Sequence, residues 1–182
     1  MRTLGHYRGW LGKQASLLAC LLIFSVSQFL IFSCEGIDCT LYNVVTLNIG
    51  FYSSESGAKV SVTDTLYITA EGTDSVLLNR GRTLQTVSLP MSYWQEADTL
   101  RLTFRGGEEE DDAYAYDIVL RIAKGNQTHF ESPDCPTSMF HEITDLDYDD
   151  PYSLTDSIIV ENTAVNYAQL ENIKIYFRGS AD

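Results

Sequence analysis

The chain has 182 residues, of which 12 are Lys or Arg and 25 are Asp or Glu, so its formal net charge at pH 7 is -13. A chain this acidic is repelled by nucleic acid and by anionic lipid head groups, so neither is expected to bind it through charge attraction. Apolar residues make up 45% and aromatic residues 12% of the chain, which suffices for a hydrophobic core and excludes a disordered protein.

The N-terminus has the layout of an export signal. Arg2, Arg8 and Lys13 precede residues 15–32, which carry no charged side chain. This apolar run is about long enough to span a bilayer, which takes roughly 20 residues. An uncleaved membrane anchor is therefore the alternative to a cleaved signal.

The apolar run ends in the sequence IFSC, residues 31–34, which resembles the bacterial lipobox. In signals of that type the cysteine thiol receives a diacylglycerol, the chain is cut just before it, and the new N-terminus is acylated. Cys20 also fits the pattern, but cleavage there would leave an apolar run of only about five residues, against the usual 7 to 15. We therefore predict lipidation at Cys34.

This processing divides the chain into a lipoprotein signal peptide, residues 1–33, and a mature domain, residues 34–182. Of the remaining cysteines, Cys39 and Cys135 form an even pair in an oxidising compartment, so we predict a disulfide between them. It would close a loop of roughly 95 residues and stabilise the fold by about 4 to 5 kcal/mol. Two separate buried thiols are the alternative.

Apolar and polar residues alternate along most of the mature segment, which predicts half-buried strands. Segments with this pattern are 44–51, 64–70, 98–105, 114–122, 156–162 and 172–178. The low-apolar stretches 53–58, 105–113 and 146–153 are predicted to be loops or strand connections. Several strands begin with Asp followed by Ser or Thr, at Asp64, Asp74, Asp98 and Asp156, where the carboxylate can bond nearby backbone amides.

About eight to ten short strands separated by turns predict an all-β protein. We expect a single-domain, two-sheet antiparallel β-sandwich of the immunoglobulin-like kind, with a β-barrel as the alternative. Helical spacing is hard to find beyond the signal, and residues 163–172 are predicted to connect the last two strands.

Several phrases together resemble a family of small uncharacterised lipoproteins from anaerobic gut bacteria, whose domain has no known function. These are IDC after the lipid cysteine, VTDTLYITAEGTDSVLLN, LPMSYWQEADTLRLTF, HFESPDCPTSMFHEI, DSIIVEN and VNYAQLENIKIYF. The resemblance covers nearly all of the mature chain and implies an exported, lipid-anchored β domain. It implies no catalytic or binding residues.

The sharpest local pattern for a metal is DLDYDDPYSLTD, residues 145–156. Asp145, Asp147 and Asp149 stand at positions 1, 3 and 5 of a twelve-residue loop and Asp156 at position 12, as in a calcium-binding loop. Asp150, however, replaces the glycine of the sharp turn, and Asp156 is shorter than the usual glutamate. A solvated acidic turn without calcium is the alternative, and no other cofactor is expected.

Three further groups have both a functional and a structural interpretation. The acidic cluster at residues 107–117 could bind a cation, or it could be a solvated loop that protects a strand edge. His129 and His141 lack zinc-ligand spacing and are predicted to be structural residues that flank the disulfide. Tyr93 and Trp94 could stack on a sugar ring or a peptide, or they could pack at the edge of the core.

No nucleophile-elbow motif and no glycine-rich phosphate loop is present, so we do not expect an enzyme. The expected function is a lipid-anchored binding or assembly module of the cell envelope. Its partners would be the membrane, through the lipid, and an envelope protein or glycan, with the domain at the outer membrane and facing the periplasm. The alternatives are an exported hydrolase or carbohydrate-active enzyme and a calcium-stabilised structural lipoprotein.

Overall fold

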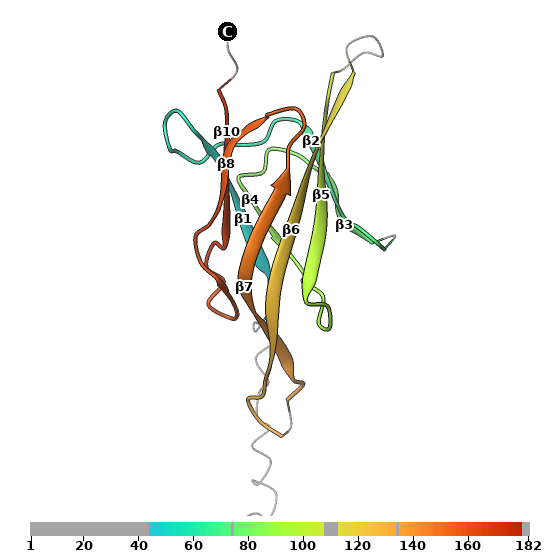
Figure 1. The fold of residues 1–182 in the computed structure, drawn as a ribbon, viewed down its shortest axis with the longest axis vertical. Coiled ribbons are helices and arrows are strands. Elements are labelled where there is room, and N and C mark those ends of the chain that lie inside the picture. Colours follow the sequence, from blue (N-terminus) through green and yellow to red (C-terminus); the bar gives the residue numbers. More distant parts are fainter. Residues whose placement is uncertain (1–43, 74, 108–112, 134, 180–182) are drawn as a thin grey trace, which may run out of the picture. The chain divides into compact units, whose positions relative to one another are not determined.

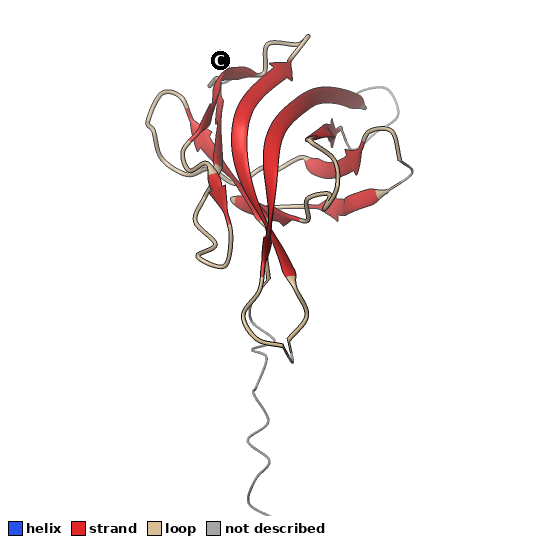
Figure 2. Cartoon of the chain, turned by 60° about the horizontal axis from the view of Figure 1, so that its bottom comes forward, coloured by secondary structure: helices blue, strands red, loops and turns tan. Residues whose placement is uncertain are grey.

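Alternating apolar and polar residues form the strands of this protein. The computed structural model describes residues 44–73, 75–107, 113–133 and 135–179, in which there are strands, turns and loops but no helix (Figure 2). The strands are β1 (Leu47–Ser53), β2 (Thr65–Ala70), β3 (Val76–Gly81), β4 (Thr86–Leu89), β5 (Ala97–Gly106), β6 (Tyr114–His129), β7 (Ser138–Asp149), β8 (Thr155–Val160), β9 (Ala164–Val165) and β10 (Ile173–Phe177).

The strands form two sheets, which confirms the predicted all-β, two-sheet architecture. One sheet has the strand order β4-β1-β10-β8 and the other the order β3-β2-β5-β6-β7-β9. In Figure 1, β5, β6 and β7 run side by side in front of β1 and β4. Apolar side chains from both sheets form one buried core, whose most buried members include Ile49, Phe51, Leu102, Leu120, Ile122 and Ile175.

The sheets are antiparallel except for one pair, which differs from the fully antiparallel prediction. β1 and β10 run parallel, with Ile49 opposite Ile173 and Phe51 opposite Ile175. Neighbouring strands joined by a tight turn must run antiparallel, whereas β1 and β10 are separated by most of the described chain. Their relative direction is therefore set by packing and has no local signal in the sequence.

β6 and β7 form the longest ladder, and a bulge interrupts it. Ala123 pairs with Asp145 and Lys124 with Ile143, so Thr144 is an extra residue on β7. A bulge shifts the alternation of a strand by one residue. Before it, Met139, His141 and Ile143 are buried on β7, and after it Leu146 is the partly buried residue, while the aspartates on either side of Leu146 are exposed.

The first residues of the predicted loop 146–153 belong to strand β7, and the bulge explains why the sequence pattern did not predict this. No single two-residue period covers all of β7, because the inward positions are odd-numbered before Thr144 and even-numbered after it. The strand therefore continues to Asp149, and the turn to β8 begins only at Asp150.

All of the described residues belong to one compact unit. The predicted signal peptide, residues 1–33, and the cysteines Cys34 and Cys39 lie outside the described residues, and their predicted roles stay predictions. Among the residues that are described, there is no helix with the length and apolar character needed to cross a membrane.

Candidate functional site

A buried lysine lies at the end of the apolar row of β6. Ile118, Leu120 and Ile122 point into the core at every second position, and Lys124 follows them on the same face. Its side chain is 0% exposed. An ammonium group taken out of water is costly unless hydrogen bonds and an opposite charge compensate it, so the partners of Lys124 define this site.

Lys124 uses all three of its donors. Its Nζ donates to the backbone oxygen of Ser92 at 2.6 Å, to that of Gln95 at 2.8 Å and to Asn126 Oδ1 at 2.8 Å. Three acceptors require three N–H groups, so the lysine is the charged ammonium even though burial lowers its pKa. The Asp98 carboxylate, 3.7 Å away and nearly buried, supplies the opposite charge.

The same residues hold the loop between β4 and β5 against β6. The backbone N–H of Lys124 donates to the backbone oxygen of Glu96 at 2.8 Å, and Asn126 Nδ2 donates to that of Gln95 at 2.9 Å. Asp98 accepts hydrogen bonds from the backbone N–H of Ser92, at 3.1 Å, and from the Ser92 hydroxyl. The role predicted for Asp98 at a strand start is thus confirmed, and both ends of residues 92–96 are fastened.

His141 completes this buried network from β7. It lies directly opposite Asn126 in the β6–β7 ladder, and its Nδ1 is 2.7 Å from Asn126 Oδ1. The amide oxygen of Asn126 can only accept hydrogen bonds, and it already accepts one from Lys124. Nδ1 of His141 is therefore the donor in its own bond to Asn126 and carries the hydrogen. Burial and the positive charge of Lys124 lower the pKa of His141 to about 4, so the ring is neutral at pH 7.

The fastened loop presents two aromatic side chains to solvent. Trp94 is 84% exposed and Tyr93 is 56% exposed. The interpretation of this pair as packing at the edge of the core is therefore wrong for Trp94. An indole this exposed buries little apolar surface, so packing in the core does not account for its position.

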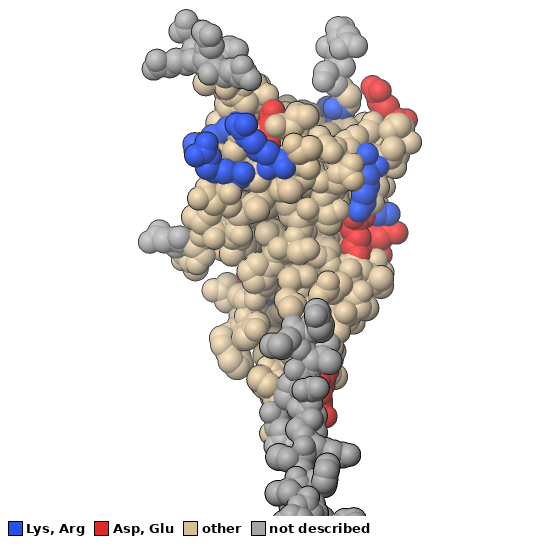
Figure 3. All heavy atoms as spheres, turned by 180° about the vertical axis from the view of Figure 1, so that it is seen from behind, with Lys and Arg blue, Asp and Glu red and all other residues tan. Residues whose placement is uncertain are grey.

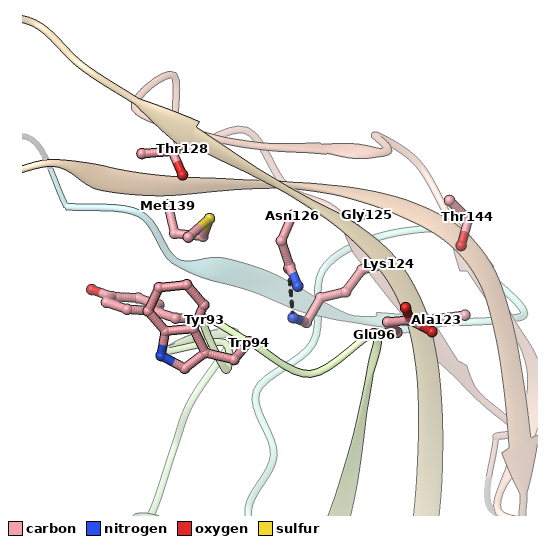
Figure 4. Close-up of a pocket in the computed structure, with 10 residues that line it drawn as sticks. All are labelled: Tyr93, Trp94, Glu96, Ala123, Lys124, Gly125, Asn126, Thr128, Met139 and Thr144. Atoms are coloured by element: carbon pink, nitrogen blue, oxygen red, sulfur yellow. Dashed lines mark hydrogen bonds between the residues drawn. The ribbon is translucent and has the colours of Figure 1, made fainter.

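Tyr93 and Trp94 form one side of an open pocket of about 630 Å³. In Figure 4 they face Met139 and Thr128, while Lys124 and Asn126 meet at the base of the loop. The lining residues are Tyr93, Trp94, Glu96, Ala123, Lys124, Gly125, Asn126, Thr128, Met139 and Thr144. The pocket is open to solvent, and its lining combines apolar and polar groups that a ligand at the surface could contact.

The twelve-residue loop that the calcium hypothesis requires is not formed. Asp145, Asp147 and Asp149 lie on strand β7, all exposed, and Asp156 lies on β8. Residues on one face of a strand are about 6.6 Å apart, whereas oxygens bound to one calcium ion are within about 5 Å of each other. Within the described ranges, no three His, Cys, Asp or Glu side chains are grouped so that they could hold a metal.

Asp150 forms the acidic turn that the sequence offered as the alternative. Its carboxylate accepts hydrogen bonds from the backbone N–H of Leu154 at 3.1 Å and from the backbone N–H and hydroxyl of Thr155, each at 2.8 Å. These bonds close the β7–β8 connection. The other acidic cluster, residues 107–117, spans the β5–β6 connection, and its residues 108–112 lie outside the described chain.

His129 has a structural role, as predicted. Its ring stacks on Phe140, with 4.2 Å between centroids, and meets the edge of Tyr167. Cys135 is disulfide-bonded. Since Cys39 lies outside the described residues, the pairing of Cys135 with Cys39 stays a prediction.

Sequence reasoning identified the aromatic pair but missed the network beneath it. The available signal was Lys124 itself, a charged residue at the next inward position of a row that contains Ile118, Leu120 and Ile122. His141 was identified, but without Asn126 as its partner. Only the ladder register, which needs the bulge at Thr144, brings the two together.

Comparison with known proteins gives one family match. The model of a family of unknown function, DUF6452, matches residues 65–177, from the first residue of β2 to the last residue of β10. The matched range contains the whole aromatic loop and its buried network. No curated protein and no solved structure matches the chain.

Replacing Lys124 with Met is expected to lower the free energy of unfolding by about 3 to 5 kcal/mol, because it leaves Asp98 and two backbone oxygens buried without their cation. Urea unfolding followed by circular dichroism measures this loss. The matched control is Arg121→Met on the same strand, since the Arg121 side chain is 49% exposed and lies 3.4 Å from an Asp147 that is 73% exposed. That change should cost below about 1 kcal/mol, and equal losses in the two variants would contradict the role given to Lys124.

The buried neutral ring of His141 predicts a pH-dependent stability. Its pKa is about 4 in the folded chain against the ordinary 6.5, so only the unfolded chain takes up this proton as the pH falls from about 6.5 to 4. The contribution of the neutral His141 ring to the free energy of unfolding is complete above pH 6.5 and is lost as the pH falls toward 4. Between pH 7.5 and pH 5 the free energy of unfolding falls by about 2 kcal/mol for this reason. Urea unfolding at both pH values should show this loss. In the His141→Gln variant, which lacks the titrating ring, the loss between the two pH values should be smaller by about 2 kcal/mol. Identical losses would contradict the prediction.

Proposed function

The chain belongs to the DUF6452 family, and we propose that it is a lipid-anchored binding module of the bacterial cell envelope whose ligand contacts the loop of Tyr93 and Trp94. In this proposal the mature domain is held at the outer membrane by acyl chains on Cys34 and faces the periplasm. The binding surface is the aromatic loop with the pocket beside it.

The observation that carries the proposal is a nearly fully exposed tryptophan on a rigid loop. Trp94 is 84% exposed, yet the oxygens of Ser92 and Gln95 on either side of the pair are fixed by Lys124. Tyr and Trp provide large contact areas with few rotatable bonds, and they are enriched among residues that dominate binding energy. A fixed loop also lowers the entropy cost of binding.

The arrangement of carboxylates favours binding over hydrolysis. A glycosidase places two carboxyl groups about 5 to 9.5 Å apart across the bond that it cleaves. Among the residues that line the pocket, Glu96 has the one carboxylate, and the nearby Asp98 is nearly buried and paired with Lys124. The site supplies a surface for contact without a pair of free acids.

The export signal and the cysteines support the envelope location. The basic start of the chain, the apolar run and the lipobox-like residues 31–34 are the features from which we propose processing and lipidation at Cys34. An acylated cysteine with two or more chains gives stable membrane anchoring. The disulfide-bonded state of Cys135 agrees with an oxidising compartment, where we propose Cys39 as its partner.

The charge distribution supports a partner other than nucleic acid. Figure 3 shows one face of the molecule, on which Lys and Arg side chains lie in small separate groups with acidic side chains beside some of them. A nucleic-acid surface would need a continuous basic stripe. Together with a net charge of -13, this favours an uncharged or basic ligand.

Intact mass spectrometry of the protein from native membranes tests the anchor and the disulfide. We expect a chain that begins at a multiply acylated Cys34, and two thiols that react with an alkylating reagent only after reduction. The Cys34→Ala variant, as control, should keep its signal segment and carry no acyl mass. A wild-type chain that retains Met1, or free thiols at Cys39 and Cys135, would contradict this placement.

Photo-crosslinking tests the binding surface without assuming a ligand class. With p-benzoylphenylalanine in place of Trp94, irradiation of intact cells should give discrete adducts. The same group in place of Tyr152, a 55% exposed tyrosine in the β7–β8 turn, is the matched control and should give none. Equal adduct patterns from the two positions would remove the aromatic loop as the binding surface.

A further inference from the structure

The pocket beside Trp94 offers a ligand one unbalanced charge, the carboxylate of Glu96. Lys124 and Glu96 are the charged residues that line it, and the charge of Lys124 is already balanced by Asp98. The Lys124 ammonium donates all three of its hydrogens to Ser92, Gln95 and Asn126, so it has none left for a ligand. An anion would find no free cationic donor among the lining residues and would meet Glu96, while a cation would find a single carboxylate there, which an uncharged ligand can use as a hydrogen-bond acceptor. The pocket therefore fits an uncharged ligand.

A peptide added as a strand would use a different part of this site from the aromatic loop. A peptide bound by strand addition needs free N–H and C=O groups along a sheet edge. In the described strands, Lys124, Asn126 and Thr128 pair with Ile143, His141 and Met139 of β7, whereas the pairing of β6 with β5 ends at Ala123, so β6 forms a sheet edge beyond that residue. Tyr93 and Trp94 offer side-chain contacts instead, which favour a ligand that stacks on a flat apolar surface.

The available side chains are two aromatic rings and several hydroxyl-binding groups. Tyr93 and Trp94 supply flat apolar surface, and Thr128, Thr144 and Glu96 supply hydrogen-bonding oxygens. A pyranose ring has the matching chemistry, since its C–H face stacks on an aromatic ring while its equatorial hydroxyls hydrogen-bond around the rim. The volume of about 630 Å³ is large enough for more than one sugar unit.

We infer that the pocket lined by Tyr93, Trp94, Glu96, Thr128 and Thr144 binds a neutral saccharide by stacking it on the aromatic loop. This inference rests on the proposed binding function and names its ligand class. Lys124 is a positioning residue, because it holds the loop and touches no ligand itself.

Trp94 gives a direct optical readout of this site. The chain has two tryptophans, Trp10 and Trp94, so the Trp10→Phe variant of the full chain in detergent reports on Trp94 alone. The probes are cellotetraose, maltotetraose, mannotetraose and chitotetraose, with tetragalacturonate as the anionic control and decaproline as the peptide control. We expect at least one neutral tetrasaccharide to change the Trp94 emission saturably with a Kd between about 10 μM and 1 mM, and neither control to do so.

Substitutions test whether the response comes from this pocket. In the same background, Tyr93→Ala should weaken the saccharide affinity by about tenfold or more while Trp94 still reports it. Tyr152→Ala, with an exposed fraction of 55% against 56% for Tyr93, is the matched control and should leave the affinity unchanged. Trp94→Ala, followed by calorimetry, should abolish binding.

Each contrary result has its own meaning. No response to any neutral tetrasaccharide at about 10 mM, well above the Kd range expected here, overturns the saccharide assignment. A response to decaproline or tetragalacturonate alone also overturns it and reassigns the ligand class. Neither result would affect the photo-crosslinking adducts from position 94, so the proposal that the aromatic loop is a binding surface would remain supported by them. A saccharide affinity unaffected by Tyr93→Ala and Trp94→Ala would overturn the site.

Discussion

The ammonium group of Lys124 is the interaction on which the candidate site depends. It lies in the core row of β6, where a charge is tolerated only because two loop carbonyls, an amide oxygen and the Asp98 carboxylate surround it. These partners include the ends of the loop that carries Tyr93 and Trp94. The cost of burying the charge therefore makes the loop conformation obligatory: if the loop moves, the cation loses its acceptors. Such coupling keeps two aromatic side chains in solvent without letting them collapse onto the core.

The bulge at Thr144 on β7, the strand paired with β6, also positions residues of the candidate site. It lets one strand place His141 beneath the loop, against Asn126, and place the aspartates Asp145, Asp147 and Asp149 outward. In a regular strand with the same sequence and no bulge, the two-residue period would point those aspartates at the core. Bulges often re-aim side chains next to functional sites, and here the bulge separates a buried polar network from an acidic exterior.

Rigidity and exposure together give the proposed function its physical basis. A lipid-anchored protein meets its ligand near a surface, where a fixed contact area lowers the entropy cost of each binding event. The described residues place their carboxylates mostly on strand exteriors and turns, while the pocket combines aromatic surface with hydroxyl-binding groups. We propose on this basis that the strands provide support and that one loop provides contact.

The sequence by itself determined the all-β class, the position of most strands and the turn role of Asp98, because two-residue alternation and turn chemistry are local properties of the chain. It also placed the aromatic pair near a turn. It could not determine that β1 and β10 run parallel, that β7 continues through the acidic segment or that Trp94 stays in solvent. Those features depend on contacts between distant residues: the acceptors of Lys124 lie 32 and 29 residues before it, and His141 reaches Asn126 only through the register set by the bulge. Only the tertiary structure brings such residues together, and their meeting creates the site.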